Sequence, residues 1–335
     1  MVLLGLYTIE HLKYSKNYLS IPLHIIEAVP LHCIGGVAVA APDRVQTTLA
    51  PHHIDMGARG IYHTGNRLND FTGKEWVFST RSVMNKAYPP SFQLELRSRH
   101  GGQKPPELCA DLIRTFTKAG QRVLDPFMGV GGTLLGATIS DRRALGVEIN
   151  PEWTGIYEEV CRREGIPAQE HIIGDSRTVL AEVEPASFDL LLTDVPYWDM
   201  DRRRRSQGKF KRAGGEASER RQSKLHRFAE DSETAPSTGI AGQGEWLDLL
   251  ANVFGQARRA LKPRAYLAVF IGDMYHSGQY HPLSMYVTGV LQNLGYTMKA
   301  NLVWYDVSKK LNVYGYRYEF IPSMVHQNIL VFRNG

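Results

Sequence analysis

From about residue 105 to the end of the chain, short apolar runs alternate with segments of helical spacing. Short apolar runs bounded by turns are typical of buried parallel strands. They occupy residues 122–124, 144–149, 171–173, 188–193, 266–272, 299–305 and 327–332. Segments with apolar residues three or four positions apart lie between them, at 108–116, 133–139, 152–163, 176–184, 246–261 and 281–294. This alternation predicts an α/β fold with a doubly wound, mostly parallel, Rossmann-like sheet of seven strands.

The regular pattern does not cover the whole chain. Residues 1–70 show no clear periodicity, so we interpret them as an N-terminal extension of unclear fold, followed by a domain over residues 71–335. A stretch rich in Ser, Gly and charged residues, 199–245, predicts an insertion at the carboxyl edge of the sheet. Its first part, 199–227, has eleven Lys and Arg against four Asp and Glu, a net charge of +7, whereas the whole chain carries +5. This concentration of charge indicates a contact with a polyanion or a solvated loop.

Aromatic and basic residues occur together in two other segments. One is 69–99, which is either a nucleic-acid face or a strip packed on the core. The other is 309–318, a hairpin or loop that either helps to hold a base or packs internally. The sequence leaves both alternatives open.

A glycine-rich turn follows the first predicted strand. Residues 123–132 read Val-Leu-Asp-Pro-Phe-Met-Gly-Val-Gly-Gly, so the strand ends at Asp125 and a helix begins near Thr133. Backbone N–H groups at such a turn face a ligand at the start of a helix. We expect this turn to bind the nucleoside part of a cofactor through Asp125, Phe127, Gly129, Gly131, Gly132 and Thr133.

Acidic residues end the next two predicted strands. Glu148 lies about twenty residues after the turn, where an acid hydrogen-bonds a ribose hydroxyl pair in folds of this kind. Asp175 ends the third strand, where a short acid can meet an adenine amino group. Because the carboxyl ends of parallel strands share one edge of the sheet, these acids favour a nucleoside over a simple phosphate as the ligand.

Two motifs resemble those of the S-adenosylmethionine-dependent DNA amino-methyltransferases, which methylate adenine N6 or cytosine N4. They are Asp-Pro-Phe-Met-Gly-Val-Gly-Gly-Thr at 125–133 and Asp-Val-Pro-Tyr at 194–197. The resemblance extends to Lys-Pro-Pro-Glu-Leu at 104–108, with the helix that follows it, and to His-Gln-Asn-Ile-Leu-Val-Phe-Arg at 326–333. It implies a methyltransferase fold, S-adenosyl-L-methionine as cofactor, and Pro106 as a further cofactor-binding residue.

The second motif suits transfer of a methyl group to an exocyclic amine. The lone pair of such an amine is delocalised into the ring, so the site must accept its N–H bonds. Asp194 can accept one, and the backbone carbonyl of Val195 the other, because Pro196 holds its predecessor extended. Tyr197, with Trp198 beside it, offers a surface on which a flipped base can stack. The family usually has proline where this chain has Val195, which makes the turn less rigid without removing the carbonyl.

Double-stranded DNA is the expected partner, and a restriction-modification context is compatible with the resemblance. Asp194 is commoner in the adenine enzymes than in the cytosine enzymes, which favours adenine N6 over cytosine N4. We then expect the insertion to bind DNA phosphates, so that DNA binding depends strongly on salt concentration. Its residues nearest to Tyr197 are Arg202, Arg203, Arg204, Arg205, Lys209, Lys211 and Arg212.

Three other functions share parts of this pattern. An RNA amino-methyltransferase would use the same chemistry and the same basic insertion. A protein-glutamine methyltransferase typically has asparagine in place of Asp194, and a catalytically silent DNA-binding regulator is hinted at only by Val195. Methyl transfer to DNA, to structured RNA or to neither separates these alternatives.

Other classes of protein fit the sequence poorly. Cys33, Cys109 and Cys161 are widely spaced and odd in number, which argues against a disulfide framework or a structural zinc site. The histidines lack the spacing of metal ligands, so we expect no metal. The apolar stretch 21–41 is broken by Glu27, prolines and histidines, so we expect no membrane span and a cytoplasmic protein.

Overall fold

The computed structural model describes residues 50–198, 242–276, 279–307, 309, 320 and 323–335. The predicted basic insertion at 199–245 and the segment 309–318 lie almost entirely outside these residues. So do residues 1–49. The boundary predicted at residue 70 therefore stays a prediction.

One large sheet organises the described residues. Its strand order is β3-β11-β12-β8-β7-β4-β5-β6. The strands are β3 (Val83–Met84), β4 (Arg122–Asp125), β5 (Arg143–Glu148), β6 (Glu170–Ile173), β7 (Phe188–Asp194), β8 (Leu261–Ile271), β11 (Tyr296–Tyr305) and β12 (His326–Asn334). Only β12 pairs antiparallel with its neighbours, β8 and β11. The prediction of a mostly parallel, doubly wound sheet is thus confirmed.

The number of strands differs from the seven predicted. The sheet has eight in the described residues, because Val83 and Met84 pair in parallel with Val303 and Trp304 at its outer edge. Two residues carry no periodicity, so the sequence could not reveal this strand.

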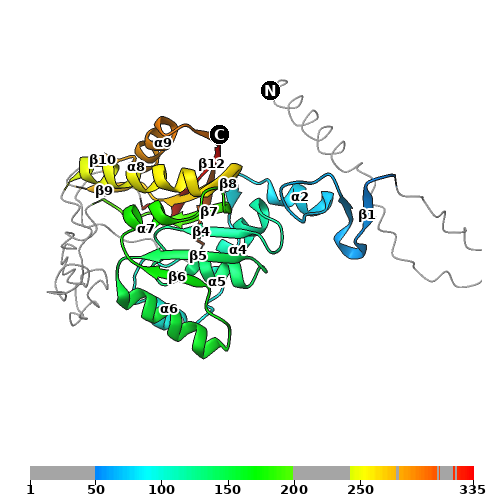
Figure 1. The fold of residues 1–335 in the computed structure, drawn as a ribbon, viewed down its shortest axis with the longest axis horizontal. Helices are drawn as coiled ribbons and strands as arrows, with labels where there is room; N and C mark the ends of the chain where they lie inside the picture. The colour runs from blue at the N-terminus through cyan, green and yellow to red at the C-terminus, as the bar shows by residue number, and fades with distance from the viewer. Residues whose placement is uncertain (1–49, 199–241, 277–278, 308, 310–319, 321–322) are drawn as a thin grey trace, which may run out of the picture. The chain divides into compact units, whose positions relative to one another are not determined.

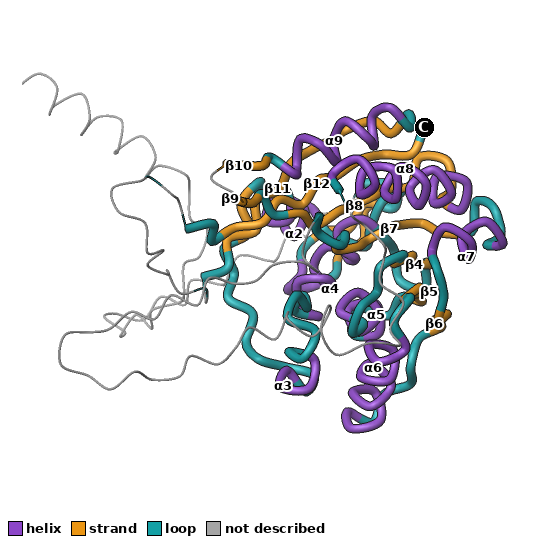
Figure 2. The backbone as a smooth tube through the Cα atoms, turned by 90° about the vertical axis from the view of Figure 1, so that its left-hand side faces the viewer, coloured by secondary structure: helices purple, strands orange, loops and turns teal. Residues whose placement is uncertain are grey.

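Helices cover both faces of the sheet (Figure 1). The helices α4 (Pro106–Phe116), α5 (Gly132–Thr138) and α6 (Pro151–Glu164) pack on one face. The other face is covered by α7 (Ser176–Glu182), α8 (Gln243–Ala260) and α9 (Leu283–Asn293). In Figure 2 the orange strands run between these two groups of purple helices. Alternate residues of one strand serve the two cores: on β7, Leu191 contributes to one, and Leu190 and Leu192 to the other.

The order of the strands creates a switch point beside β4. The chain moves outward in one direction through β5 and β6, then crosses back to β7 on the other side of β4. Ligands of doubly wound sheets bind at the carboxyl ends of the strands at such a point. Asp125 and Asp194 are the last residues of β4 and β7, so the topology places both at this position.

Smaller elements precede and interrupt the sheet. Before it come β1 (His53–Asp55), a 3-10 turn at Gly57–Arg59, β2 (Ile61–His63), α2 (Gly73–Ser79) and α3 (Leu94–Arg97). Thr72 starts α2 with a capping box completed by Glu75, which also pairs with Arg59 at 2.8 Å. The strands β9 (Met274–His276) and β10 (Gln279–His281) form a short antiparallel pair between β8 and α9.

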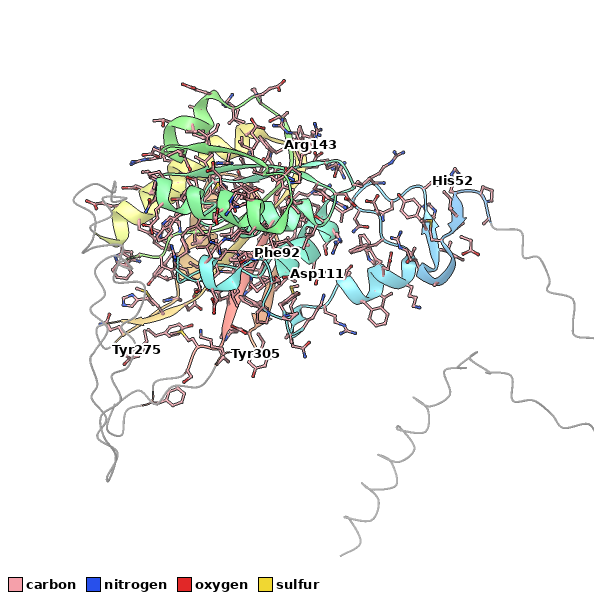
Figure 3. The ribbon with its side chains drawn as sticks, turned by 90° about the horizontal axis from the view of Figure 1, so that it is seen from below. His52, Phe92, Asp111, Arg143, Tyr275 and Tyr305 are labelled. Atoms are coloured by element: carbon pink, nitrogen blue, oxygen red, sulfur yellow. The ribbon has the colours of Figure 1, made fainter. Side chains whose placement is uncertain are left out.

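The aromatic and basic segment 69–99 does not behave as one surface. Tyr88 and Phe92 pack against the core, and Tyr88 donates a hydrogen bond of 3.0 Å to Asp111 on α4, which Figure 3 labels together with Phe92. Trp76 and Phe78, in contrast, are exposed on α2. Arg97 is fully buried. Part of this segment is therefore packed on the core, and a nucleic-acid face on the exposed part stays a prediction.

Candidate active site

The ends of β4 and β7 meet at one pocket. Its lining includes residues of the glycine-rich turn together with Asp194. Asp125 and Thr193, the residue before Asp194, are both buried and joined by a hydrogen bond. The full lining is His100, Gly102, Gln103, Lys104, Asp125, Phe127, Met128, Gly129, Val130, Gly132, Thr133, Asp194 and Phe270.

The glycine-rich turn is held in a shape that few residues other than glycine adopt. Gly129 has a φ angle of +50° and Gly131 one of +77°. A Cβ atom on Gly131 would lie 2.2 Å from the ring of Tyr157, so both conformation and space require glycine there. The N–H of Gly129 donates to Oε2 of Glu148 at 2.9 Å, which links the turn to the end of β5.

Two of the three predicted cofactor acids, Asp125 and Glu148, end strands, whereas Asp175 follows β6 by two residues, and the three differ in environment. Burial raises the pKa of Asp125 to about 6. Burial likewise raises the pKa of Glu148 to about 7, although its carboxylate accepts hydrogen bonds from the N–H groups of Gly129 and Asn150. Asp175 caps α7 and pairs with Arg177, whose hydrogen bond lowers the pKa of Asp175. Glu148 and Asp175, with Pro106 and Gly131, do not form part of the pocket lining among the described residues.

Asp194 has two different carboxylate oxygens. Oδ2 forms an ion pair with Nζ of Lys104, whose side chain is only 8% exposed. Oδ1 is buried and has no hydrogen-bond partner within the described residues. Burial raises the pKa of Asp194, and the ion pair with Lys104 opposes this rise. An unpaired acceptor buried in this way costs about 1–3 kcal/mol, a cost that a donor from a ligand would remove.

The residues after Asp194 are fixed by neighbouring elements. Val195 is buried in the core, 1% exposed, so its side chain contributes packing where proline would be usual. The carbonyl of Pro196 accepts a hydrogen bond of 2.7 Å from the indole of Trp246 on α8. The hydroxyl of Tyr197 accepts from the N–H of Gly272 at 2.7 Å and from Nε2 of Gln327 at 2.8 Å.

Trp198 is the last described residue before the insertion. Its ring meets His281 edge to face, with centroids 4.9 Å apart. The predicted phosphate-binding residues follow it and lie outside the described residues, so their role stays a prediction. They are Arg202, Arg203, Arg204, Arg205, Lys209, Lys211 and Arg212.

Comparison with known proteins agrees with this arrangement. Residues 57–159 match the family model described as DNA methylase. Type II methyltransferase M.HindIII of Haemophilus influenzae is 44% identical over 72 residues, 22% of each chain. Orphan methyltransferase M.BamHII of Bacillus amyloliquefaciens is 29% identical over 103 residues, 31% of this chain and 37% of that protein. Over these residues the chain is similar to the amino-methyltransferase family, whose members use S-adenosylmethionine.

The relatives of this chain are not confined to enzymes named for DNA. The tRNA (guanine(10)-N2)-dimethyltransferase of Pyrococcus abyssi is 25% identical over 164 residues, 49% of this chain and 46% of that protein. The chain thus matches less than half the length of each of these curated relatives. Among solved structures, TrmN from Thermus thermophilus is similar with a TM-score of 0.45 and 15% identity, over 73% of this chain and 53% of that one.

Several residues in or beside the pocket had no role in the sequence-based predictions. Lys104 pairs with Asp194, although the two are ninety positions apart. His100 lines the pocket, lies edge to face with Trp153 and has its pKa lowered to about 4 by burial. Phe270 comes from β8, and Gln327, which is outside the lining but binds the hydroxyl of Tyr197, comes from β12. No local spacing identifies these residues, because only the sheet brings them together.

Two general features complete the description. No helix of the described residues is long and apolar enough to cross a membrane. The same residues contain no group of three or more His, Cys, Asp or Glu side chains placed to hold a metal ion.

Proposed function

We propose that this protein transfers a methyl group from S-adenosylmethionine to the exocyclic amino group of a flipped base in double-stranded DNA, with adenine N6 favoured over cytosine N4. The observation that carries the proposal is the position of Asp194. Its Oδ1 atom is a buried acceptor without a partner in the described residues, and the residue lines the same pocket as the glycine-rich turn. An amino group is the complementary donor.

The residues around the pocket fit the proposed cofactor. Gly129 and Gly132 line it without side chains, and Phe127 adds an aromatic surface for a nucleoside. In the proposal, Glu148 accepts from the ribose hydroxyls and Asp175 meets the adenine amino group, while Asp125 holds the turn through the N–H of Phe127. Gly131, Thr133 and Pro106 complete the set. When bound, S-adenosylmethionine supplies a methyl group on a positively charged sulfur, ready for in-line transfer.

The target amine is held by the residues from Asp194 to Tyr197. Asp194 Oδ1 accepts one N–H, and the carbonyl of Val195 accepts the other, so that the nitrogen lone pair turns toward the methyl carbon. Tyr197 presents its ring for stacking, because Gly272 and Gln327 fix its hydroxyl. Transfer would form the N–C bond and break the C–S bond, and the excess proton of the methylated nitrogen would leave to the carboxylate of Asp194 or to solvent. Positioning and electrostatic stabilisation provide the catalysis.

Recognition of the polynucleotide is assigned to the basic insertion. Arg202–Arg205 follow Tyr197 by a few residues in sequence, which favours a contact with the phosphates beside the flipped base. The relatives named as Type II methyltransferases support DNA as the substrate and a restriction-modification context. The relative named as a tRNA dimethyltransferase supports a second candidate, methylation of a base amine in structured RNA.

A single set of assays separates these candidates. The wild-type protein and Asp194→Asn are incubated with labelled S-adenosylmethionine and either unmethylated DNA or structured RNA. Long-read modification mapping of DNA from cells that express each protein then reports the base and its context. Adenine methylation in DNA that Asp194→Asn abolishes supports the proposal. Transfer to RNA alone selects the second candidate, and cofactor binding without any transfer indicates a silent regulator.

A further inference from the structure

We propose that Lys104 is the positioning residue of this active site: its ammonium group holds Oδ2 of Asp194, so that Oδ1 is left as the acceptor for the target amine. This inference rests on the proposed function for its meaning in catalysis. The contact itself is a feature of the described residues.

The position of Lys104 is fixed by its backbone. Arg97 donates a hydrogen bond from its guanidinium group to the carbonyl of Lys104, and both residues are buried. The α5 helix approaches so closely that a Cβ atom on Gly132 would lie 3.1 Å from the same carbonyl. Pro105, the next residue, is the N-cap of α4. A residue anchored on three sides in this way carries its side chain to a defined place.

The side chain of Lys104 has few other contacts to make. Nζ donates to the carbonyl of Gly102 at 3.3 Å and lies 5.4 Å from the ring centroid of Phe270. Its main partner is therefore the carboxylate of Asp194. A buried lysine without a partner would be unfavourable, and so would a buried carboxylate, which explains why the two occur together.

The pair has a chemical consequence for the amine. A carboxylate in a buried site tends to take up a proton, and a protonated carboxyl group is a weaker acceptor that can donate instead. Lys104 opposes protonation of Asp194 and at the same time occupies one of its two oxygens. The remaining oxygen is then oriented, and its protonation is opposed by the neighbouring ammonium group.

Other titratable and charged groups face the pair. They are His100 and Arg97 before α4, Asp125 at the end of β4, Tyr197 after β7 and Lys309 after β11. Asp125 is the group whose titration is most easily mistaken for that of Asp194 in a pH profile of activity, since burial raises the pKa of Asp125 to about 6. A test must therefore observe the carboxyl group of Asp194 itself.

The chain offers a matched control on the same strand. Asp189, at the start of β7, pairs with Lys262 at 2.7 Å, at the opposite end of the strand from Asp194. Lys262→Met removes an ion pair of the same kind without touching the pocket. Lys104→Met removes the pair in the pocket, Lys104→Gln removes its charge and keeps a donor, and Lys104→Arg keeps the charge.

The experiment measures the titration of the Asp194 side-chain carbon by ¹³C NMR, with the signal assigned by its loss in Asp194→Asn. We expect the titration to move upward by about 1–3 pH units in Lys104→Met and Lys104→Gln. Lys104→Arg and Lys262→Met should leave it near its wild-type position. If Lys104→Met does not fold, the polar Lys104→Gln variant carries the test. An unchanged titration in a folded neutral variant overturns the proposal.

Activity gives the second measurement. In Lys104→Met, the acidic limb of the pH profile of kcat/KM for methyl transfer should shift to higher pH together with the Asp194 titration. At pH values above this shifted limb, the variant should recover most of the wild-type activity. A loss of equal size at every pH would mean that Lys104 only supports the fold and would overturn the proposal. If the wild type transfers no methyl group to DNA or RNA, the proposed function fails, whereas the NMR titration still decides the role of Lys104.

Discussion

Thr193 donates a hydrogen bond of 2.6 Å from its hydroxyl group to Oδ1 of Asp125. Thr193 is 0% and Asp125 2% exposed, so the bond forms away from water. It links the strand that ends in the glycine-rich turn to the strand that ends in Asp194, beside their parallel pairing at Val123 and Leu124. The separation between the proposed cofactor and the proposed target amine is therefore set by buried backbone and side-chain bonds rather than by loops.

Tyr197 should reveal whether its ring or its hydroxyl serves the reaction. Tyr197→Phe removes the acceptor for Gly272 and Gln327, and we expect the free energy of unfolding to fall by about 1–3 kcal/mol with much of the activity kept. Tyr197→Ala also removes the stacking surface, worth about 1–3 kcal/mol per base. Denaturant titration and KM for DNA measure the two effects. Equal loss of activity in both variants would contradict stacking as the main role.

The sequence predicted the framework of this site because the framework is periodic. Six helices and seven strands of the main domain lie where apolar spacing placed them, although β8 begins at Leu261, five residues earlier than expected. That earlier part contains Lys262, Pro263 and Arg264, which are exposed and hide the strand signal. Asp125 and Asp194 were placed correctly because each ends an apolar run.

The contacts across the pocket could not be predicted in the same way. Lys104 belongs to a segment that precedes a helix, and nothing in its neighbours indicates a partner ninety residues later. Gln327 reaches Tyr197 only because β12 inserts between β8 and β11. Such contacts depend on strand order, which a single sequence does not state.

Glu148 should make cofactor binding depend on pH. Burial raises its pKa from 4.5 to about 7, so the proposed acceptor for the ribose is increasingly protonated below pH 7. Affinity for S-adenosylmethionine should then weaken by up to about tenfold for each pH unit below 7. Calorimetric titration from pH 5.5 to 8.5 in steps of roughly half a unit measures this trend.

The stability of the cofactor-free protein should change in the opposite direction. Because the folded pKa of Glu148 lies above the unfolded one, its contribution to stability is present below pH 4.5 and is lost as the pH rises through about 7. Asp125 adds a contribution of the same sign. Glu148→Gln should reduce the pH dependence of both the cofactor affinity and the stability. An unchanged slope of affinity against pH would reject the role of Glu148.

The basic insertion should control the salt dependence of DNA binding. Replacing Arg202–Arg205 with glutamine removes up to four phosphate contacts, and each contact contributes about 0.9 to the slope of log affinity against log salt for B-DNA. Fluorescence anisotropy at several salt concentrations measures that slope. Replacing Arg162 and Arg163, exposed on α6 and paired with Glu159, provides a control that removes two positive charges outside the insertion. A slope that does not change would show that Arg202–Arg205 do not contact phosphates.

The glycine-rich turn should tolerate no side chain at Gly131. Gly131→Ala places a Cβ atom 2.2 Å from the Tyr157 ring in a backbone with φ of +77°, so we expect a loss of stability of at least about 1–3 kcal/mol from overpacking, with additional backbone strain and weakened cofactor binding. Gly155→Ala is the matched control, because it lies inside α6 with no atom near the new methyl group. There alanine should stabilise the helix by about 0.5–1 kcal/mol. Thermal unfolding of both variants separates the effects, and similar stability in the two would mean that Tyr157 yields and the turn is not rigid.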